Sequence, residues 1–454
     1  MKRDGFKEII NLVIPIFLEL LFINLLGFFD TFMISKYSQA SVIAIGNAAT
    51  VIGIFTVLLS VASRGTNVII SQFLGARDTN NAHKTMYSGI WFNLALAFIL
   101  LIVVQLFGYQ LLKLIKVDDR YIAEAVRYLR IVSCGMPFLA ITNVFGAVFR
   151  SYKMPKILTI SALISNAVNV GLNFVLIFGI AGLLRPLGSV GAGVATLISY
   201  VLNFIIGYIF LKVRITKRVF SFKVKKHNLE ILLKIGLPSA LESFVYTFAN
   251  MILMSAVNTL DASMPGLAAG RSYLNQILSF IIQLSTAFGL ANQILVGHAV
   301  GEGNYEKANK STFKSIAMCL PIVEFLVLLL VLFGKYIFRI YAPNNPSDIE
   351  GFNTAINEVL RVLPYIFLLE LGRCLNIISI NALQASGDVI FPLINAIISM
   401  LLIMGLGSIA LGVWLNLGLL GVYLACAIDE GLRAIIMLIR WKSKKWQTKG
   451  IVKA

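Results

Sequence analysis

Apolar residues occur in long runs that recur along the whole chain, separated by short polar segments. A helix needs about 20 such residues to cross the hydrocarbon core of a bilayer. The ten-residue alternation that marks membrane β-strands is absent from the sequence. The pattern predicts twelve membrane-spanning helices, near residues 9–35, 43–73, 86–108, 121–149, 157–180, 188–212, 230–260, 266–300, 312–334, 355–384, 391–412 and 417–441.

The composition leads to the same class of protein. Of the 454 residues, 58% are hydrophobic and only 13% are charged, and the mean hydropathy is +0.85. A soluble domain of this size cannot hide so much apolar surface in its core. We therefore expect an all-α, multi-pass integral membrane protein that is surrounded by lipid.

The formal net charge of +18 arises mainly in alternate loops. Basic residues gather before the first span and after the second, fourth, sixth and twelfth, most densely between Lys212 and Lys226. Because cytoplasmic loops carry the excess of Lys and Arg, both termini and the central loop are expected in the cytoplasm. The membrane topology thus accounts for the positive net charge of the chain. We expect no nucleic-acid partner, and we place the protein in the cell (plasma or inner) membrane.

The two halves of the chain resemble each other at an offset of about 223 to 227 residues. Each half holds six predicted spans, so the pseudo-symmetry axis runs along the membrane normal. We predict an N-terminal lobe (1–212), a cytoplasmic linker (213–229) and a C-terminal lobe (230–454). The corresponding segments are 14–19 with 237–242, 71–84 with 297–310, and Pro137 with Pro364.

Asp30 lies near the middle of the apolar run from Leu12 to Ile34. A charge there costs about 2.5–3.5 kcal/mol on insertion scales, so this carboxyl must be paired, protonated or bound to an ion. The matching position in the second half, fifteen residues after Pro238 as Asp30 is fifteen after Pro15, is Leu253. We therefore expect ion coupling to be concentrated in the first lobe.

Two asparagines, Asn169 and Asn173, are four residues apart and so share one face of the fifth predicted span. Their carbonyl oxygens, together with a carboxylate, form a hard-oxygen set that suits sodium or stabilises a protonatable acid. The alternative is that these buried amides simply hold helices together.

Several segments share their order and half-chain spacing with one known family. They are the opening Pro with an acid one turn later, FFDTFMIS (28–35), SQFLGARD (71–78), NAVNVGLNFVLIFG (166–179), GSVGAGVAT (188–196), VGHAVGEGNYEKA (296–308) and LELGRCLNIISINALQASGDVIFP (369–392). Together they resemble the multidrug and toxic compound extrusion (MATE) family, in particular its bacterial members. The resemblance covers essentially the whole chain.

The resemblance implies twelve helices in two pseudo-symmetric six-helix lobes. It also implies a secondary active antiporter that exports organic cations in exchange for Na⁺ or H⁺ by alternating access, as a monomer and without a cofactor. The cation site of the family's first lobe falls here on Asp30, Asn169, Asn173 and Thr196. Some relatives have a second acid where Asn173 stands, so this chain has one titratable group fewer at that point.

Further acids in the predicted spans allow two interpretations each. Glu19 lies eleven residues before Asp30, about three helical turns, so it lines the same cavity or pairs near the membrane end. Its counterpart Glu242 has the same two alternatives. Glu370 and Arg373 are three apart and can pair across one turn, as a structural pair or as a functional one.

Aromatic and sulfur-containing residues in the spans are the remaining candidates. Phe28, Phe29 and Met251 line a drug site or pack against lipid and other helices.

Two other classes of function would require different residues. A lipid-linked oligosaccharide flippase of the same superfamily would need a basic cavity, and its candidate anion contacts are Arg64, Arg271 and Arg373. The unpaired acid in the first span favours cationic cargo instead. No GxxxxGK[ST], HExxH or paired metal-binding acid motif occurs in the sequence, so we expect no enzyme activity.

Overall fold

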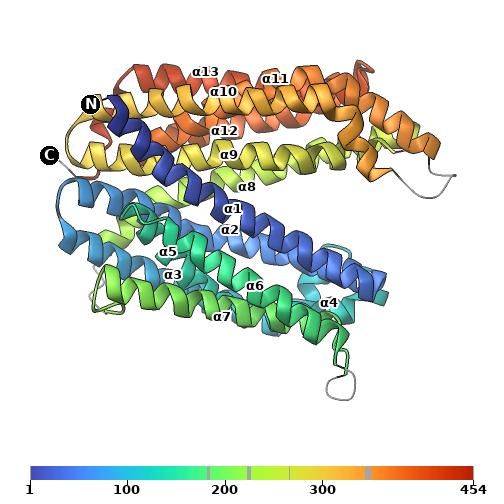
Figure 1. The fold of residues 1–454 in the computed structure, drawn as a ribbon, viewed down its shortest axis with the longest axis horizontal. Coiled ribbons are helices and arrows are strands. Elements are labelled where there is room, and N and C mark those ends of the chain that lie inside the picture. Colours follow the sequence, from blue (N-terminus) through green and yellow to red (C-terminus); the bar gives the residue numbers. More distant parts are fainter. Residues whose placement is uncertain (1, 181–184, 222–225, 265, 343–348, 453–454) are drawn as a thin grey trace. The chain divides into compact units, whose positions relative to one another are not determined.

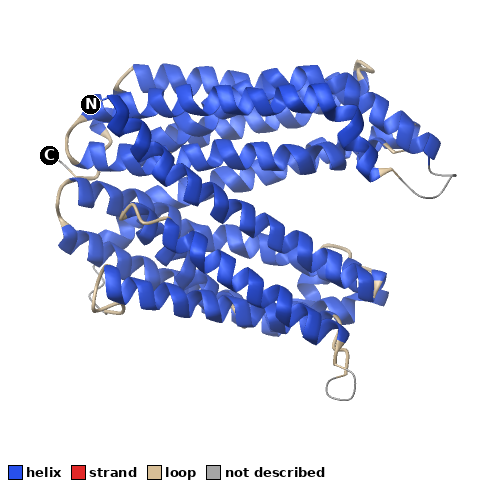
Figure 2. Cartoon of the chain, viewed as in Figure 1, coloured by secondary structure: helices blue, strands red, loops and turns tan. Residues whose placement is uncertain are grey.

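Helices form almost the whole of the described chain (Figure 2). The computed structural model describes residues 2–180, 185–221, 226–264, 266–342 and 349–452, without the side chains of 2–4, 28 and 350. All twelve predicted spans are helical in these residues, which confirms the all-α fold class. The helices are α1 (Lys2–Tyr37), α2 (Gln39–Gly75), α3 (Thr79–Leu114), α4 (Asp119–Ser133), α5 (Met136–Ser151), α6 (Lys156–Phe178), α7 (Ser189–Arg214), α8 (Lys226–Ser263), α9 (Leu267–Gly301), α10 (Tyr305–Phe338), α11 (Ile349–Ala385), α12 (Ile390–Ser399) and α13 (Gly418–Lys442).

Short helical segments of other types complete the described chain. Helix α12 continues through two π-helical stretches, η3 (Met400–Leu406) and η4 (Ile409–Trp414), into one long apolar element. The 3₁₀ segments η1 (Arg339–Tyr341) and η5 (Lys445–Thr448) follow α10 and α13.

Length and hydropathy qualify these helices as membrane spans. Ten helical elements in the described residues are long and apolar enough to cross a membrane by themselves, and α4 with α5 qualifies as a bent pair. Helix α13 differs because Asp429, Glu430 and Arg433 interrupt its apolar sequence. The protein is therefore an integral membrane protein with the helices that its hydrophobic pattern predicts.

The fourth span is bent by 50° between α4 and α5. Gly135 stands at the break and Pro137 enters the first turn of α5, where a missing N–H is tolerated. A Cβ atom on Gly135 would lie 2.7 Å from the ring of Tyr200, so only glycine permits this approach. The repeat-related Pro364 lies inside α11, which continues past it. The two halves therefore differ at this pair of prolines.

The chain forms two compact units. The N-terminal unit is Ile14–Ala240, and the C-terminal unit is Leu241–Ala454 together with Met1–Val13. Helices α1 and α8 each contribute to both units, and each passes from one to the other within a few residues of an internal proline, Pro15 or Pro238. A proline inside a helix removes one backbone hydrogen bond and favours a change of direction there. The predicted division into lobes 1–212 and 230–454 with a linker at 213–229 stays a prediction.

The turns after α2 and α9 show the internal repeat at the level of single hydrogen bonds. Arg77 and Gly303 both adopt the left-handed conformation. Each is followed by a helix cap, Asp78 or Asn304, whose side chain accepts a hydrogen bond from the backbone N–H three residues later, at 3.0 and 2.9 Å. These cap side chains satisfy backbone N–H groups at the start of α3 and α10, so the corresponding helices of the two halves begin in the same way.

In the C-terminal unit, α11 packs against α9, α10 and α13, and α10 and α13 lie alongside it in Figure 1. The α11–α13 contact is close at Gly372, where a Cβ atom would lie 2.7 Å from the backbone nitrogen of Gly431. This approach brings the next residue of α11, Arg373, against the acids of α13.

Candidate functional site

The first site joins α1 and α6 through Asp30. Its Oδ1 accepts a hydrogen bond from Asn173 Nδ2 at 2.5 Å, and the same amide donates to Asn169 Oδ1 at 2.9 Å. Both asparagines are fully buried, whereas Asp30 is half-buried. The structure thus brings together three of the four residues predicted for a cation site.

Two polar atoms of this group lack a partner within the described part of the chain, namely Asn173 Oδ1 and Asn169 Nδ2. Buried polar atoms are nearly always hydrogen-bonded, so each such atom needs an explanation. An unsatisfied amide oxygen beside a carboxylate is an arrangement that a hard cation completes. The described residues contain no group of three or more His, Cys, Asp or Glu that could hold a metal ion. A cation here would therefore depend on amide and hydroxyl oxygens as well as on Asp30.

The fourth predicted residue, Thr196 on α7, is joined to the group indirectly. Its hydroxyl donates to Ala192 O within its own helix at 3.0 Å, and the side chain lies near the hydroxyl of Tyr128. Tyr128 and Tyr200 both lie within electrostatic range of Asp30. Sequence reasoning missed these tyrosines, although polar hydroxyls on apolar helices were a usable signal.

Glu19 forms an ion pair with Arg150 of α5 at 2.9 Å. Its counterpart Glu242 accepts a hydrogen bond from Gln384 of α11 at 2.8 Å. Arg150 and Gln384 lie at matching points of the two halves. Each stands three residues before a residue with a left-handed backbone conformation, Lys153 after α5 or Gly387 after α11. The geometry favours the pairing interpretation for both acids, with Arg150 as a partner of Glu19 and Gln384 as a partner of Glu242.

Glu370 and Arg373 pair across one turn of α11, as their spacing predicts. Arg373 also contacts Glu430 of α13 at 3.5 Å, and Arg433 contacts Glu430 at 3.0 Å and Asp429 at 2.7 Å. These five side chains form one buried network of three carboxylates and two guanidinium groups. Because each arginine bridges acids, the arrangement favours a structural role for the Glu370–Arg373 pair.

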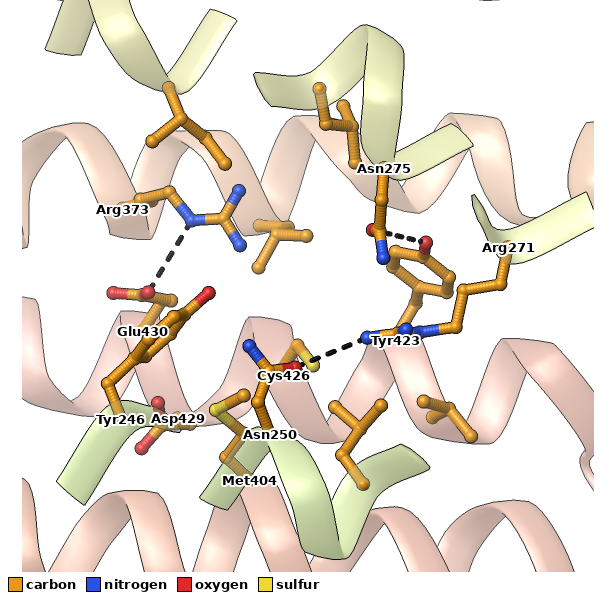
Figure 3. A pocket seen from close by; sticks show the side chains of 15 residues that line it. Tyr246, Asn250, Arg271, Asn275, Arg373, Met404, Tyr423, Cys426, Asp429 and Glu430 are labelled. Carbon is orange, nitrogen blue, oxygen red and sulfur yellow. Dashed lines mark hydrogen bonds and ion pairs between the residues drawn. The ribbon is translucent and has the colours of Figure 1, made fainter. Parts of the chain in front are cut away.

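A cavity of about 250 Å³ lies beside this network inside the C-terminal unit. Figure 3 shows Arg373 and Glu430 on one side of it and Arg271 with Asn275 and Tyr423 on the other. Met404, from the π-helical stretch η3, also reaches it, and such stretches often occur at functional sites. The labelled lining residues are Tyr246, Asn250, Arg271, Asn275, Arg373, Met404, Tyr423, Cys426, Asp429 and Glu430.

The predicted aromatic and sulfur candidates do not meet at either site. Phe29 on α1 is 42% exposed and Met251 on α8 is 66% exposed. Met251 belongs to an open depression on α8 together with Met254 and Asn258. The side chain of Phe28 lies outside the described residues.

Comparisons with known proteins give a consistent result. The MatE family model matches residues 15–175 and 238–409, two stretches that begin at the repeat-related prolines. The uncharacterized transporter YisQ of Bacillus subtilis (strain 168) is 32% identical over 99% of this chain and 96% of its own length. The probable multidrug resistance protein NorM of Thermotoga maritima is 26% identical over 98% of this chain and 94% of its own. A solved structure, described as an outward-facing multidrug resistance MATE family transporter of the MOP superfamily, superposes with a TM-score of 0.87 at 21% identity, covering 97% of both chains.

Proposed function

The chain belongs to the MatE family, and on that premise we propose that it is a cation-coupled antiporter that exports small organic cations. Its relatives include probable multidrug resistance proteins, which supports efflux of small organic molecules. The observation that carries the proposal is the contact of Asp30 with Asn173 at 2.5 Å, next to a second buried amide. No comparable acid stands at the equivalent position of the other half, which is Leu253.

The chemistry of this group suggests how coupling would proceed. Asp30 is the only carboxylate of its set, so it holds one positive charge at a time, as Na⁺, as H⁺ or as the charged end of a substrate. Asn173 holds the carboxylate in place, and its free carbonyl oxygen completes the coordination of a metal ion. An ion that enters down its gradient displaces the organic cation, and alternating access of the site to the two sides of the membrane converts this competition into export.

Membrane placement follows from the distribution of charge. We propose that the protein lies in the cell membrane as a monomer, with both termini and the basic segment 212–226 on the cytoplasmic side, because cytoplasmic loops retain Lys and Arg. The prediction that the chain has no cofactor and no enzyme activity is part of the same proposal.

The flippase alternative receives less support from the basic side chains. Arg271 and Arg373 line the same cavity, but Arg373 is held by two carboxylates. Arg64 belongs to the other unit and donates to the backbone oxygen of Ser239 at 3.0 Å. A pyrophosphate carries at least two negative charges, and one uncompensated guanidinium in a cavity of about 250 Å³ is a poor match for a lipid-linked oligosaccharide.

The test is transport by purified protein in proteoliposomes, with ethidium as substrate and with an imposed sodium or proton gradient. We expect one of the two gradients to drive ethidium movement, and Asp30→Asn to reduce it to the level of protein-free liposomes. Asn is nearly isosteric with Asp, so this loss reports the charge rather than the packing.

Two further variants sharpen the test. Asp119→Asn removes a carboxylate that is 75% exposed, and we expect it to transport like the unmodified protein. Asn173→Leu removes the partner of Asp30, and we expect it to lower the rate at least tenfold. A normal gradient-driven rate in Asp30→Asn would rule out the proposed mechanism.

A further inference from the structure

Arg271 is a buried arginine in α9 that lines the cavity of the C-terminal unit and has no acidic partner. It is only 9% exposed. Its guanidinium contacts Asn250 Oδ1 at 3.3 Å and the sulfur of Met254, and no carboxylate among the described residues pairs with it. A buried positive charge is costly unless it is paired, so the position of Arg271 calls for an anionic partner.

Other buried or half-buried arginines of the chain show what is usual in this protein. Four of them, Arg150, Arg373, Arg433 and Arg440, each contact at least one carboxylate. Arg271 departs from this pattern although its helix begins close to an acid. Asp261 instead accepts from the backbone N–H groups of Gly266 and Ala268 at 3.0 and 2.9 Å, which commits its Oδ1 atom to the start of α9.

Two amides extend the group of donors around Arg271. Asn250 uses its oxygen to accept from Arg271, and Asn275 uses its oxygen to accept from the hydroxyl of Tyr423 at 3.0 Å. No described residue accepts from the nitrogen of either amide, so both keep N–H groups for a ligand. In Figure 3 these side chains gather at one end of the cavity. A guanidinium with flanking amides is a set that binds a carboxylate, and the planar guanidinium does so in bidentate fashion.

The opposite end of the cavity has the other electrostatic character. There the buried network contains three carboxylates, of Glu370, Asp429 and Glu430, against the two guanidinium groups of Arg373 and Arg433. A ligand with a cationic end and an anionic end matches both walls. The volume of about 250 Å³ is slightly below the range of roughly 300–1,000 Å³ for drug-sized ligands, so the ligand must be small.

We propose that this cavity binds a small zwitterionic molecule, with its carboxylate on Arg271 and its ammonium group toward the acids of α13. The proposal rests on the proposed export function, because it defines a subclass of organic cations that carry a carboxylate and gives them a site in the C-terminal unit. Asp30 plays no part in it.

The experiment measures binding by isothermal titration calorimetry to the full chain in lipid nanodiscs. The probes are 4-(aminomethyl)benzoate and its methyl ester, which keeps the ammonium group and loses the negative charge. We expect the unmodified protein to bind the zwitterion at least tenfold more tightly than the ester. In Arg271→Gln this ratio should fall to about one, and in Arg271→Lys it should be intermediate, because an ammonium group keeps the charge but not the bidentate geometry.

A matched control is Arg361→Gln, which removes a guanidinium that is 57% exposed on α11 and should leave the ratio unchanged. Equal affinities of the unmodified protein for zwitterion and ester would overturn the proposal without any variant, and so would a ratio that survives in Arg271→Gln. Inorganic pyrophosphate serves as a third probe. If it displaces the zwitterion and binds more tightly, the site is one for phosphate groups and the proposal is wrong.

Ethidium transport measured on the same preparations separates this inference from the proposed function. Selective binding of the zwitterion without gradient-driven transport would support the site and refute the antiporter. Normal transport of ethidium without selective binding would refute the site and leave the antiporter in place.

Discussion

Glu19→Gln is expected to destabilise the N-terminal unit substantially, because it leaves Arg150 without its carboxylate. The two side chains are 12% and 19% exposed, and their N–O distance is 2.9 Å. Removal of one partner from a buried ion pair costs about 3–5 kcal/mol, since the remaining charge keeps its desolvation penalty. Arg150 retains some contact with solvent, so we expect about 3 kcal/mol.

A loss of this size is measurable as a shift in thermal unfolding. For domains of roughly 150–250 residues, each 1 kcal/mol shifts Tm by about 2–4 °C, so Glu19→Gln should lower Tm by roughly 6–12 °C. The assay is thermal unfolding of the purified protein in one detergent at neutral pH. The double variant Glu19→Gln with Arg150→Gln should recover at least half of the loss, because two neutral amides can form a hydrogen bond in place of the ion pair.

An exposed ion pair supplies the control. Lys307 Nζ lies 2.8 Å from Glu302 Oε2, but the two side chains are 47% and 38% exposed, so Glu302→Gln should cost less than about 1 kcal/mol. Equal losses for Glu19→Gln and Glu302→Gln, or no recovery in the double variant, would refute this account of the Glu19–Arg150 pair.

Two further predictions concern packing and pH. Gly236→Ala should prevent or severely impair folding, because a Cβ atom would lie 2.1 Å from the backbone oxygen of Val61, whereas Gly53→Ala, with no atom within 4 Å, should express and migrate on size exclusion like the unmodified protein. Hydrogen bonds from the side chain and backbone of Arg120 lower the pKa of the exposed Asp118 carboxyl to about 2. Since the unfolded value is about 3.9, the stabilisation is present above that pH and disappears as the pH falls through about 2. The Tm difference between Asp118→Asn and the unmodified protein should thus be constant from pH 5 to 8 and shrink below pH 4, and a difference that changes between pH 5 and 8 would contradict this assignment.

The sequence alone predicted the helices and the repeat with good accuracy. Hydropathy over a span is a local property, so all twelve apolar runs became helices near the predicted residues. Local spacing also placed Asn169 and Asn173 on one face, and it paired Glu370 with Arg373. The matched segments 71–84 and 297–310 form corresponding turns, in which the structure adds the caps Asp78 and Asn304. Each of these features depends on residues a few positions apart, where helix geometry fixes the relation.

Contacts between helices decided which side chains pair across the fold. Glu19 and Arg150 are far apart in the sequence, and nothing in the spacing of either showed that they pair. Tyr128 came to Thr196 through the packing of α4 with α7. Arg271 and Arg373 are both basic residues in apolar spans, and the sequence offers an acid within one helical turn only to Arg373, namely Glu370. The close approach of α11 and α13 at Gly372 adds Glu430 of α13 to the partners of Arg373, whereas Arg271 on α9 lies at the end of the cavity that amides line, opposite the acids. The charge of a side chain is a property of the sequence, but whether that charge is compensated depends on which helix packs against it.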